Sequence, residues 1–381
     1  MRRGVVRHSI LFLFILFCAF GAAAAVGRAP QPEGGLRFAK EFDIPPGGRF
    51  PARTGLRFGG ISSLARIADG RQMFGISDDR EQPRAYRFAV DISGGRFTVT
   101  PIETIRLSSD RRAPAALDPE GIVVLPDGHL LVSSEGIGDK EPRIPPAILE
   151  YTRHGRFVRQ LPIRPRYVPN PTGPLDRGVR PNAAFESLTI TADATRLFTA
   201  TETALTQDGA AATFELGTRA RLLEYVKGSG SFAPAREFVY PIDAIDPVPF
   251  TPGFTIIGLT DLLALDGSEL LSLERTYVEN PAHADESIYR IKVFRVSLAG
   301  ATDVSRVESL TGSQATPVTK TLLLDLSQVT GLSPALARLD NFEGMTFGPR
   351  LPNGRRSLIL VSDDNFNELQ RTSFLLFEVE P

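Results

Sequence analysis

The sequence has almost no cysteine and no large excess of charge of either sign. Its single cysteine, Cys18, falls in an N-terminal leader, so the rest of the chain can form neither a disulfide framework nor a cysteine zinc site. Stability must then come from a large hydrophobic core. The formal charge is −1 and becomes about −4 once the three arginines of the leader are removed, which argues against nucleic acid or an anionic membrane surface as the main partner.

Long apolar runs are also absent, apart from one near the N-terminus. Three arginines precede an apolar stretch, 10–20, and small residues follow it, 22–25. The stretch is shorter than the roughly 20 residues that a membrane-spanning helix needs, and this order of residue types is typical of a signal peptide. We therefore predict a signal peptide over 1–25, a linker over 26–35, one domain over 36–381, and a secreted or periplasmic protein without a membrane span after cleavage. An uncleaved anchor helix is the alternative.

Several common catalytic motifs are missing as well. Ser62 and Ser63 do not form the G-x-S-x-G elbow of serine hydrolases. His129, His154 and His283 lie in predicted turns or a loop without paired spacing, so solvated turn histidines are expected rather than zinc ligands. The sequence contains neither a P-loop nor a dinucleotide-binding fingerprint.

The sequence does contain a repeated hairpin. In residues 118–136, DPEGIVVLPDGHLLVSSEG, two apolar runs flank an Asp-Gly dipeptide, which is a strong hairpin signal. The same order of strand, turn, strand and acidic residue returns four times. The further copies are 59–79, 185–202, 260–275 and 342–365. Such a recurring order indicates a repeat architecture.

A second pair of predicted strands follows these hairpins, for example in 85–105, 147–163 and 221–242. Together with abundant Gly, Pro, Thr, Val and Phe, four strands per repeat predict an all-β chain that forms a β-propeller with four-stranded blades. We count five blades, and a β-sandwich is the alternative fold. The stretches long enough to hide a sixth blade are 164–184, 242–258 and 299–340.

The two ends of the predicted domain carry one unpaired strand each. LRFAKEFDIP, 36–45, precedes the first hairpin, and SFLLFEVE, 373–380, leaves the last unit one strand short. Pairing the two would close the ring and remove an exposed edge. We therefore predict that the N-terminal strand completes the C-terminal blade.

Acidic residues recur at two places in the repeated hairpins. Hairpin geometry brings the start of the first strand and the end of the second strand to one open end, so these acids are predicted to ring the mouth of a central channel. The residues are Glu120, Glu186 and Glu343 at strand starts, and Glu135, Glu202 and Asp364, with Asp363, at strand ends; Asp78, Asp79 and Glu274 join from the other units.

Crowded carboxylates repel one another unless a cation or an arginine compensates their charge. Hard oxygen ligands suit Ca²⁺, or another divalent cation such as Mg²⁺, better than zinc. Basic residues follow three of the acids, at Arg80, Lys140 and Arg275, and could neutralise them or receive an anionic substrate. The alternative is that the acids only accept hydrogen bonds from loop amides and that the basic residues are ordinary surface cations.

Several ordered motifs together give a family resemblance. The sequence resembles the phytase-like domain family, often described as having esterase-like activity, over 55–380, in GGISSLARI with GISDD, DPEGIVVLPDGHLLVSSEG, AFESLTITADATRLFTATE, LLSLERTY, and NFEGMTFG with LILVSDDN. The resemblance implies a secreted propeller and, by way of the β-propeller phytases, phosphoester hydrolysis with Ca²⁺. The chain departs from the family pattern at Ser63 and Ser187, where glycine is favoured, and has Thr260 where other units have Glu.

Three functions are consistent with these features. The first is a divalent-metal-dependent phosphoesterase, in which the cation polarises the phosphoryl group while Arg80, Lys140 or Arg275 steadies its charge. The second is a propeller hydrolase for a carboxylic ester or a lactone, with one metal as Lewis acid. The third is a ligand-binding propeller without catalysis. We expect a monomer whose substrate is a small-molecule ester or phosphoester.

Overall fold

A computed structural model describes residues 35–44, 56–67, 70–108 and 110–380. All of them belong to the compact unit that spans residues 32–381. The predicted signal peptide with Cys18, all of the predicted linker except its last residue, and Asp69 of the first hairpin turn lie outside the described residues. Within the described part of the chain, no helix is long and apolar enough to cross a bilayer.

The described residues form twenty strands in five antiparallel four-stranded sheets. The first sheet contains β2 (Ile61–Ile67), β3 (Gln72–Ser77), β4 (Arg84–Asp91) and β5 (Thr98–Arg106). The second contains β6 (Pro119–Val124), β7 (Leu130–Ser134), β8 (Ala147–Tyr151) and β9 (Phe157–Gln160). The third contains β10 (Thr189–Ile190), β11 (Arg196–Ala200), β12 (Thr218–Lys227) and β13 (Phe232–Ile242).

The fourth sheet contains β14 (Thr255–Ala264), β15 (Glu269–Val278), β16 (Ile288–Ser297) and β17 (Thr319–Asp325). The fifth contains β18 (Asn341–Phe347), β19 (Ser357–Asp363), β20 (Thr372–Val379) and β1 (Leu36–Ile44). Helical structure in the described residues is limited to six short 3₁₀ turns. These are η1 (Ser93–Gly95), η2 (Pro165–Tyr167), η3 (Thr206–Asp208), η4 (Ala284–Glu286), η5 (Leu326–Gln328) and η6 (Pro334–Leu336).

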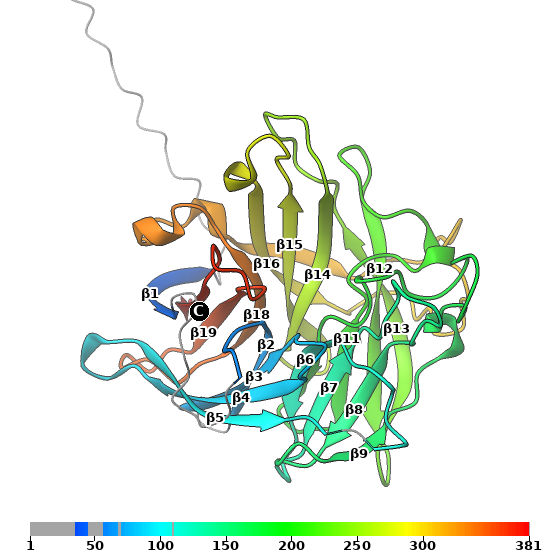
Figure 1. Ribbon diagram of the computed structural model, residues 1–381, viewed down its shortest axis with the longest axis horizontal. Helices are drawn as coiled ribbons and strands as arrows, with labels where there is room; N and C mark the ends of the chain where they lie inside the picture. Colours follow the sequence, from blue (N-terminus) through cyan, green and yellow to red (C-terminus); the bar gives the residue numbers. More distant parts are fainter. Residues whose placement is uncertain (1–34, 45–55, 68–69, 109, 381) are drawn as a thin grey trace, which may run out of the picture. The chain divides into compact units, whose positions relative to one another are not determined.

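The five sheets are arranged around one axis through their first strands. Each first strand contacts the first strand of the next sheet, in the closed order β2, β6, β10, β14, β18 and back to β2. Within a sheet, successive strands lie side by side, as Figure 1 shows for β6, β7, β8 and β9. This is a five-bladed β-propeller, so the predicted fold class is confirmed and the choice between five and six blades is decided among the described residues. Of the stretches that could have hidden a sixth blade, 299–340 supplies β17 and the other two add no separate sheet.

The first strand in the sequence is the outermost strand of the last blade. β1 pairs antiparallel with β20, from Leu36 opposite Val379 to Ile44 opposite Thr372. The pairing gives hydrogen-bond partners to an edge of β20 that would otherwise be open.

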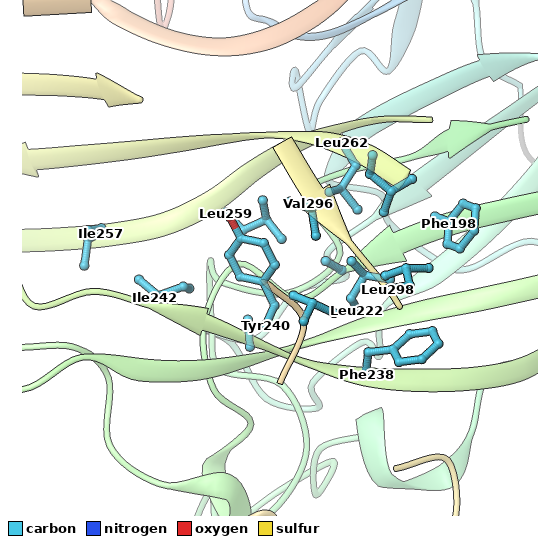
Figure 2. Close-up of a cluster of buried hydrophobic side chains, with 14 of the residues drawn as sticks. Phe198, Leu222, Phe238, Tyr240, Ile242, Ile257, Leu259, Leu262, Val296 and Leu298 are labelled. Atoms are coloured by element: carbon cyan, nitrogen blue, oxygen red, sulfur yellow. The ribbon is translucent and has the colours of Figure 1, made fainter. Parts of the chain in front are cut away.

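The hydrophobic core is divided into five large clusters, one at each seam between neighbouring blades. Figure 2 shows the seam between the third and fourth blades, where Phe238 and Tyr240 of β13 pack with Leu259 of β14 and Val296 of β16. These side chains are almost completely buried. Because the described residues contain no cysteine, the apolar seams take the place of disulfides in holding the ring together.

We expect the loss of β1 to destabilise the whole ring. Deleting residues 36–44 removes the pairing with β20 and the side chain of Leu36, which is 2 % exposed and packs in the seam between the fourth and fifth blades. A chain that starts at residue 46 should melt well below a control chain that starts at residue 30, and it should aggregate through the open edge of β20. Differential scanning fluorimetry and light scattering measure the two effects. Equal melting and equal scattering would show that β1 is dispensable.

Candidate functional site

A one-residue bulge occurs at the same level in the first hairpin of every blade. In β2, Ile61 pairs with Ser77 while Ser63 pairs with Ile76, so Ser62 is the extra residue. The residues at the five bulges are, in chain order, Ser62, Glu120, Glu186, Thr260 and Glu343. A bulge bends its strand and redirects a side chain. The fold therefore turns three glutamates toward one end of the central channel.

These bulges open into a cavity of about 920 Å³. Its walls are strongly acidic, because seven carboxylates and three arginines line it. The carboxylates are Asp78, Asp79, Asp118, Glu120, Glu186, Glu343 and Asp363, and the arginines are Arg57, Arg80 and Arg275. Four of the five blades supply the acids. Tyr277, Tyr289 and Phe366 add aromatic surface to the same walls.

The tightest group of carboxylates belongs to the second blade. One oxygen each from Asp118, Glu120 and Glu135 lies within 4.8 Å of the others, and all three side chains are buried. The hairpin itself brings them together, since Pro119 pairs with Ser134 and the acids flank this pair. We call these three residues the carboxylate cluster.

Two neighbouring blades hold the carboxylate cluster in place. The backbone N–H of Ala184, before β10, donates a hydrogen bond to the Glu135 carboxylate. From the first blade, Arg80 Nη2 lies 2.5 Å from Asp118 Oδ2. Arg80 also donates to the Asn182 side-chain oxygen at 2.8 Å. Loops of the first and third blades therefore contact the carboxylate cluster from its two sides.

Arg275 compensates a second set of acids. Its Nη2 atom lies 3.1 Å from Glu202 Oε1 and 3.2 Å from Glu343 Oε1, and its side chain is only 13 % exposed. The arginine comes from the fourth blade, whereas Glu202 ends a strand of the third blade and Glu343 begins the fifth. The guanidinium group of Arg275 therefore bridges three blades at the edge of the cavity.

The structure places other predicted residues outside this cavity wall. Glu274 points away from it and accepts hydrogen bonds from Lys320 Nζ and the Tyr240 hydroxyl, both at 2.7 Å. Lys140 is exposed and is not among the residues that line the cavity. Alternation along β15 explains the contrast between Glu274 and Arg275, because successive side chains point to opposite faces of a sheet.

At the end of β19 the two adjacent aspartates differ in their surroundings. Asp363 lines the cavity, whereas Asp364 accepts hydrogen bonds from the backbone N–H groups of Gly60 at 2.8 Å and Phe366 at 3.2 Å. Gly60 has φ 67° and a Cβ there would lie 2.5 Å from Phe366 Cε2, so only glycine lets the first blade approach the fifth this closely. Asp364 thus ties the first blade to the fifth.

Burial sets the electrostatics of the site. Burial, and then repulsion from Asp118 and Glu202, raises the pKa of Glu135 to about 8. Burial, and then the charges of Glu343 and Asp118, raises the pKa of Asp78 to about 7. Burial also raises the pKa of Glu202 to about 7, although Arg275 opposes the shift. The pKa values of Glu120 and Glu186 lie well above the usual range, first through burial and then through the neighbouring acids.

The donor atoms of the cavity suit a hard cation. Among the described residues, no hydrogen-bond donor reaches the buried oxygens Asp78 Oδ1 and Asn341 Oδ1 of the cavity wall, or Glu202 Oε2 behind it. Buried polar atoms normally have a partner, and carboxylate and amide oxygens are the ligands that Ca²⁺ prefers. The residues present therefore fit a divalent cation, which the carboxylate cluster is best arranged to hold.

Sequence reasoning did not single out Asp118 or Asp261. Asp118 stands two residues before Glu120 in the repeated motif, and the hairpin signal could have placed it at the same open end. Asp261 gave no such signal, because the matching position in the other units is never acidic: it is held by Ser63, Gly121, Ser187 and Gly344.

Asp261 lies across the channel axis. Its Oδ2 atom accepts a hydrogen bond from the Met345 backbone N–H at 2.7 Å and from Ser63 Oγ at 3.4 Å. The aspartate belongs to the fourth blade and Ser63 to the first, which are not neighbours in the ring. Burial raises the pKa of Asp261 well above its usual value. This fully buried carboxyl group therefore closes the channel behind the acidic cavity.

Replacing Arg275 with methionine should destabilise the protein more at pH 8 than at pH 5. At pH 8 the variant leaves Glu202 and Glu343 as like charges without compensation, a defect that costs about 3–5 kcal/mol in buried pairs. At pH 5 both acids can take up protons, which relieves the repulsion. Urea unfolding at the two pH values measures the difference.

Arg295→Met is the matched control, because Arg295 pairs with Glu269 on the surface. This exposed pair should contribute less than about 1 kcal/mol at either pH. An equal loss of stability for Arg275→Met at pH 5 and pH 8 would show that Arg275 acts through packing rather than through its charge.

Comparison with known proteins identifies a family. Residues 56–366 match the family described as phytase-like, with the esterase-like activity of phytase. No curated protein sequence matches the chain. Among solved structures, a periplasmic gluconolactonase of Pseudomonas aeruginosa is 15 % identical, with 92 % of this chain and 99 % of that chain covered and a TM-score of 0.35.

Two further structures have comparable scores. An α-L-arabinofuranosidase of Podospora anserina is 8 % identical, with 92 % and 98 % coverage and a TM-score of 0.42. A gluconolactonase of Xanthomonas campestris is 12 % identical, with 91 % and 98 % coverage and a TM-score of 0.31. Such values carry no argument about function. The match over residues 56–366, in contrast, covers most of the chain, and the protein belongs to the phytase-like family.

Proposed function

We propose that the protein is a divalent-metal-dependent ester hydrolase that acts at the acidic cavity, with phosphoesters as substrate class and Ca²⁺ as cation. The observation that carries the proposal is the convergence of seven carboxylates from four blades on one cavity whose walls contain buried oxygens without a partner among the described residues. The signal peptide expected over residues 1–25 would direct this activity out of the cytoplasm. We expect the protein to act as a monomer.

The carboxylate cluster, Asp118, Glu120 and Glu135, would hold the cation, with Asp78 beside it. Glu186 and Glu343 line the same cavity, whereas Glu202 and Asp364 support it from behind through Arg275 and Gly60. When bound, a divalent cation supplies Lewis acidity toward an ester oxygen. Its charge would also lower the pKa values that crowding and burial have raised.

The protein's own residues would perform the remaining tasks. Arg57 and Arg80 line the cavity and could receive the negative charge of a phosphoryl group, as bidentate arginines commonly do. Arg275 is already paired with two glutamates and serves to hold them in position. Glu186, with its raised pKa, can hold a proton on its carboxyl group and donate it to the departing alcohol oxygen. Lys140 is exposed and has no role in this scheme.

We expect hydrolysis of an aryl phosphate to require calcium and Glu120. Replacing Glu120 with glutamine keeps the shape of the side chain but removes one charge from the carboxylate cluster. Phosphate release should stop with chelator and return with calcium. Glu120→Gln should raise the calcium concentration needed for half-maximal activity on the order of tenfold to a hundredfold. Calcium titrations of the initial rate measure the effect.

Glu269→Gln is the matched control, since it is the same substitution at a strand residue that pairs with Arg295 at the surface. It should leave activity unchanged. Turnover of an aryl ester or a lactone without phosphate release would instead make the protein a carboxylic esterase or lactonase. Calcium-dependent stabilisation without any turnover would make it a ligand-binding propeller.

Without metal, the protein should lose stability as the pH rises from 5 to 8. In the folded protein Asp78, Glu135 and Glu202 have pKa values of about 7, 8 and 7, which are raised above the usual values of Asp and Glu side chains. The unfolded chain therefore binds fewer protons than the folded protein in this range. The free energy of unfolding decreases as the pH rises. Melting temperatures in chelator should decrease by several degrees between pH 5 and pH 8.

Calcium should reverse this trend, because its ligands must be deprotonated and its affinity therefore grows with pH. At a hundredfold excess over its Kd it should stabilise the folded state by about 2.7 kcal/mol. Melting curves at pH 5 and pH 8 with and without calcium test both statements. A calcium effect of the same size at both pH values would mean that the raised-pKa acids are not the ligands.

A further inference from the structure

A second cavity, of about 520 Å³, lies farther along the same five inner strands. In β2, Ser62 faces the acidic cavity, whereas the following residues 64–67 line this second cavity. The other blades contribute in the same way, through residues 122–126, 188–192, 262–265 and 346–347. Asp261, which lines neither cavity, stands one residue before the fourth of these segments.

The second cavity has a different chemistry from the first. Leucine, isoleucine, valine and alanine form most of its walls, and the residues that line it include two arginines, Arg66 and Arg356, but neither aspartate nor glutamate. It is an apolar cavity with positive charge on one side only. Its size lies within the range of small-molecule sites.

The two arginines are not neutralised by the described chain. Neither guanidinium group forms an ion pair with a described residue, and both groups lie over the ring of Phe347, with Cζ at 6.0 Å for Arg66 and 3.9 Å for Arg356. The backbone N–H of Arg66 donates to Thr346 Oγ1 at 3.1 Å, which ties the first blade to the fifth beside this ring. Phe347 therefore has two positively charged groups close to its ring.

Both side chains are exposed to solvent, where an anion can reach them, and each adds to the positive potential at the other. Burial, and then repulsion from Arg66 and Arg350, lowers the pKa of Arg356. A carboxylate placed between the two guanidinium groups would remove the repulsion and could accept hydrogen bonds from both. The remainder of such a ligand would enter the apolar part of the cavity, where burial of its methylene groups is favourable.

We propose that this second cavity binds a small amphiphilic carboxylate, with its apolar chain between the inner strands and its carboxylate group on Arg66 and Arg356. The site is independent of the acidic cavity and of the hydrolase activity proposed for it. The two arginines favour a ligand with a carboxylate over one with a neutral head group. The apolar walls favour a ligand with a long apolar chain over acetate.

Isothermal titration calorimetry with decanoate, decanol and acetate tests the proposal. Chelator is present throughout, so that carboxylate binding to calcium in the acidic cavity does not contribute. Decanoate should bind, decanol should bind about tenfold or more weakly, and acetate should show no measurable heat. In the double variant Arg66→Gln, Arg356→Gln, decanoate should fall to the affinity of decanol while decanol itself is unchanged.

Arg295→Gln serves as the control, because it removes a surface arginine that pairs with Glu269 and does not line this cavity. It should leave decanoate binding unchanged, and Arg356→Gln alone replaces the double variant if that variant does not fold. Equal affinities for decanoate and decanol, or decanoate binding that survives the double variant, would overturn the proposal. So would arginine-dependent cosedimentation with phosphatidylglycerol vesicles in the absence of decanoate binding, which would make this face a membrane-binding surface.

Discussion

Packing between neighbouring blades is the constraint on which the rest of the structure depends. Each sheet is apolar on both faces and is stable only when a blade covers each of them, so the five seams must form a closed circle. Closure brings five inner strands to one axis, where Asp78 and Asp363, far apart in the sequence, line one cavity. The acidic site is therefore a product of ring closure rather than of any single blade.

The seams also allow the protein to tolerate an unfavourable concentration of charge. Burying several carboxylates together destabilises their ionised forms, and Arg80 and Arg275 compensate only some of them. Proteins commonly accept such local instability at functional sites when the surrounding structure is stable enough to hold it. Here the surrounding structure is the apolar ring, and the buried carboxylates of the site lie together at the acidic cavity.

Local patterns in the sequence predicted the blades and part of the site. Asp-Gly turns and alternating apolar residues are short-range signals, and they were sufficient to place Glu120 and Glu135 at one end of their hairpin, where the structure brings them together. Whether Glu274 or Arg275 faces the cavity depends on the register of β15, and the pattern gave no reason to exclude Glu274. The bulges change that register by one residue in every blade, and Asp261 finds its partners Met345 and Ser63 in two other blades, so neither follows from a single repeat.

The pairing of β1 with β20 also imposes an order on folding. The chain is made from its N-terminus, so Leu36 emerges before any blade exists, whereas its partner Val379 is added only after the other four blades. Contacts between residues so distant in sequence are slow to form, because a very long loop must close first. Until then the four other blades can assemble as an open arc, whose two end blades each present an uncovered apolar face. Only when β18, β19 and β20 have been added and β20 has paired with β1 does this arc become a closed ring.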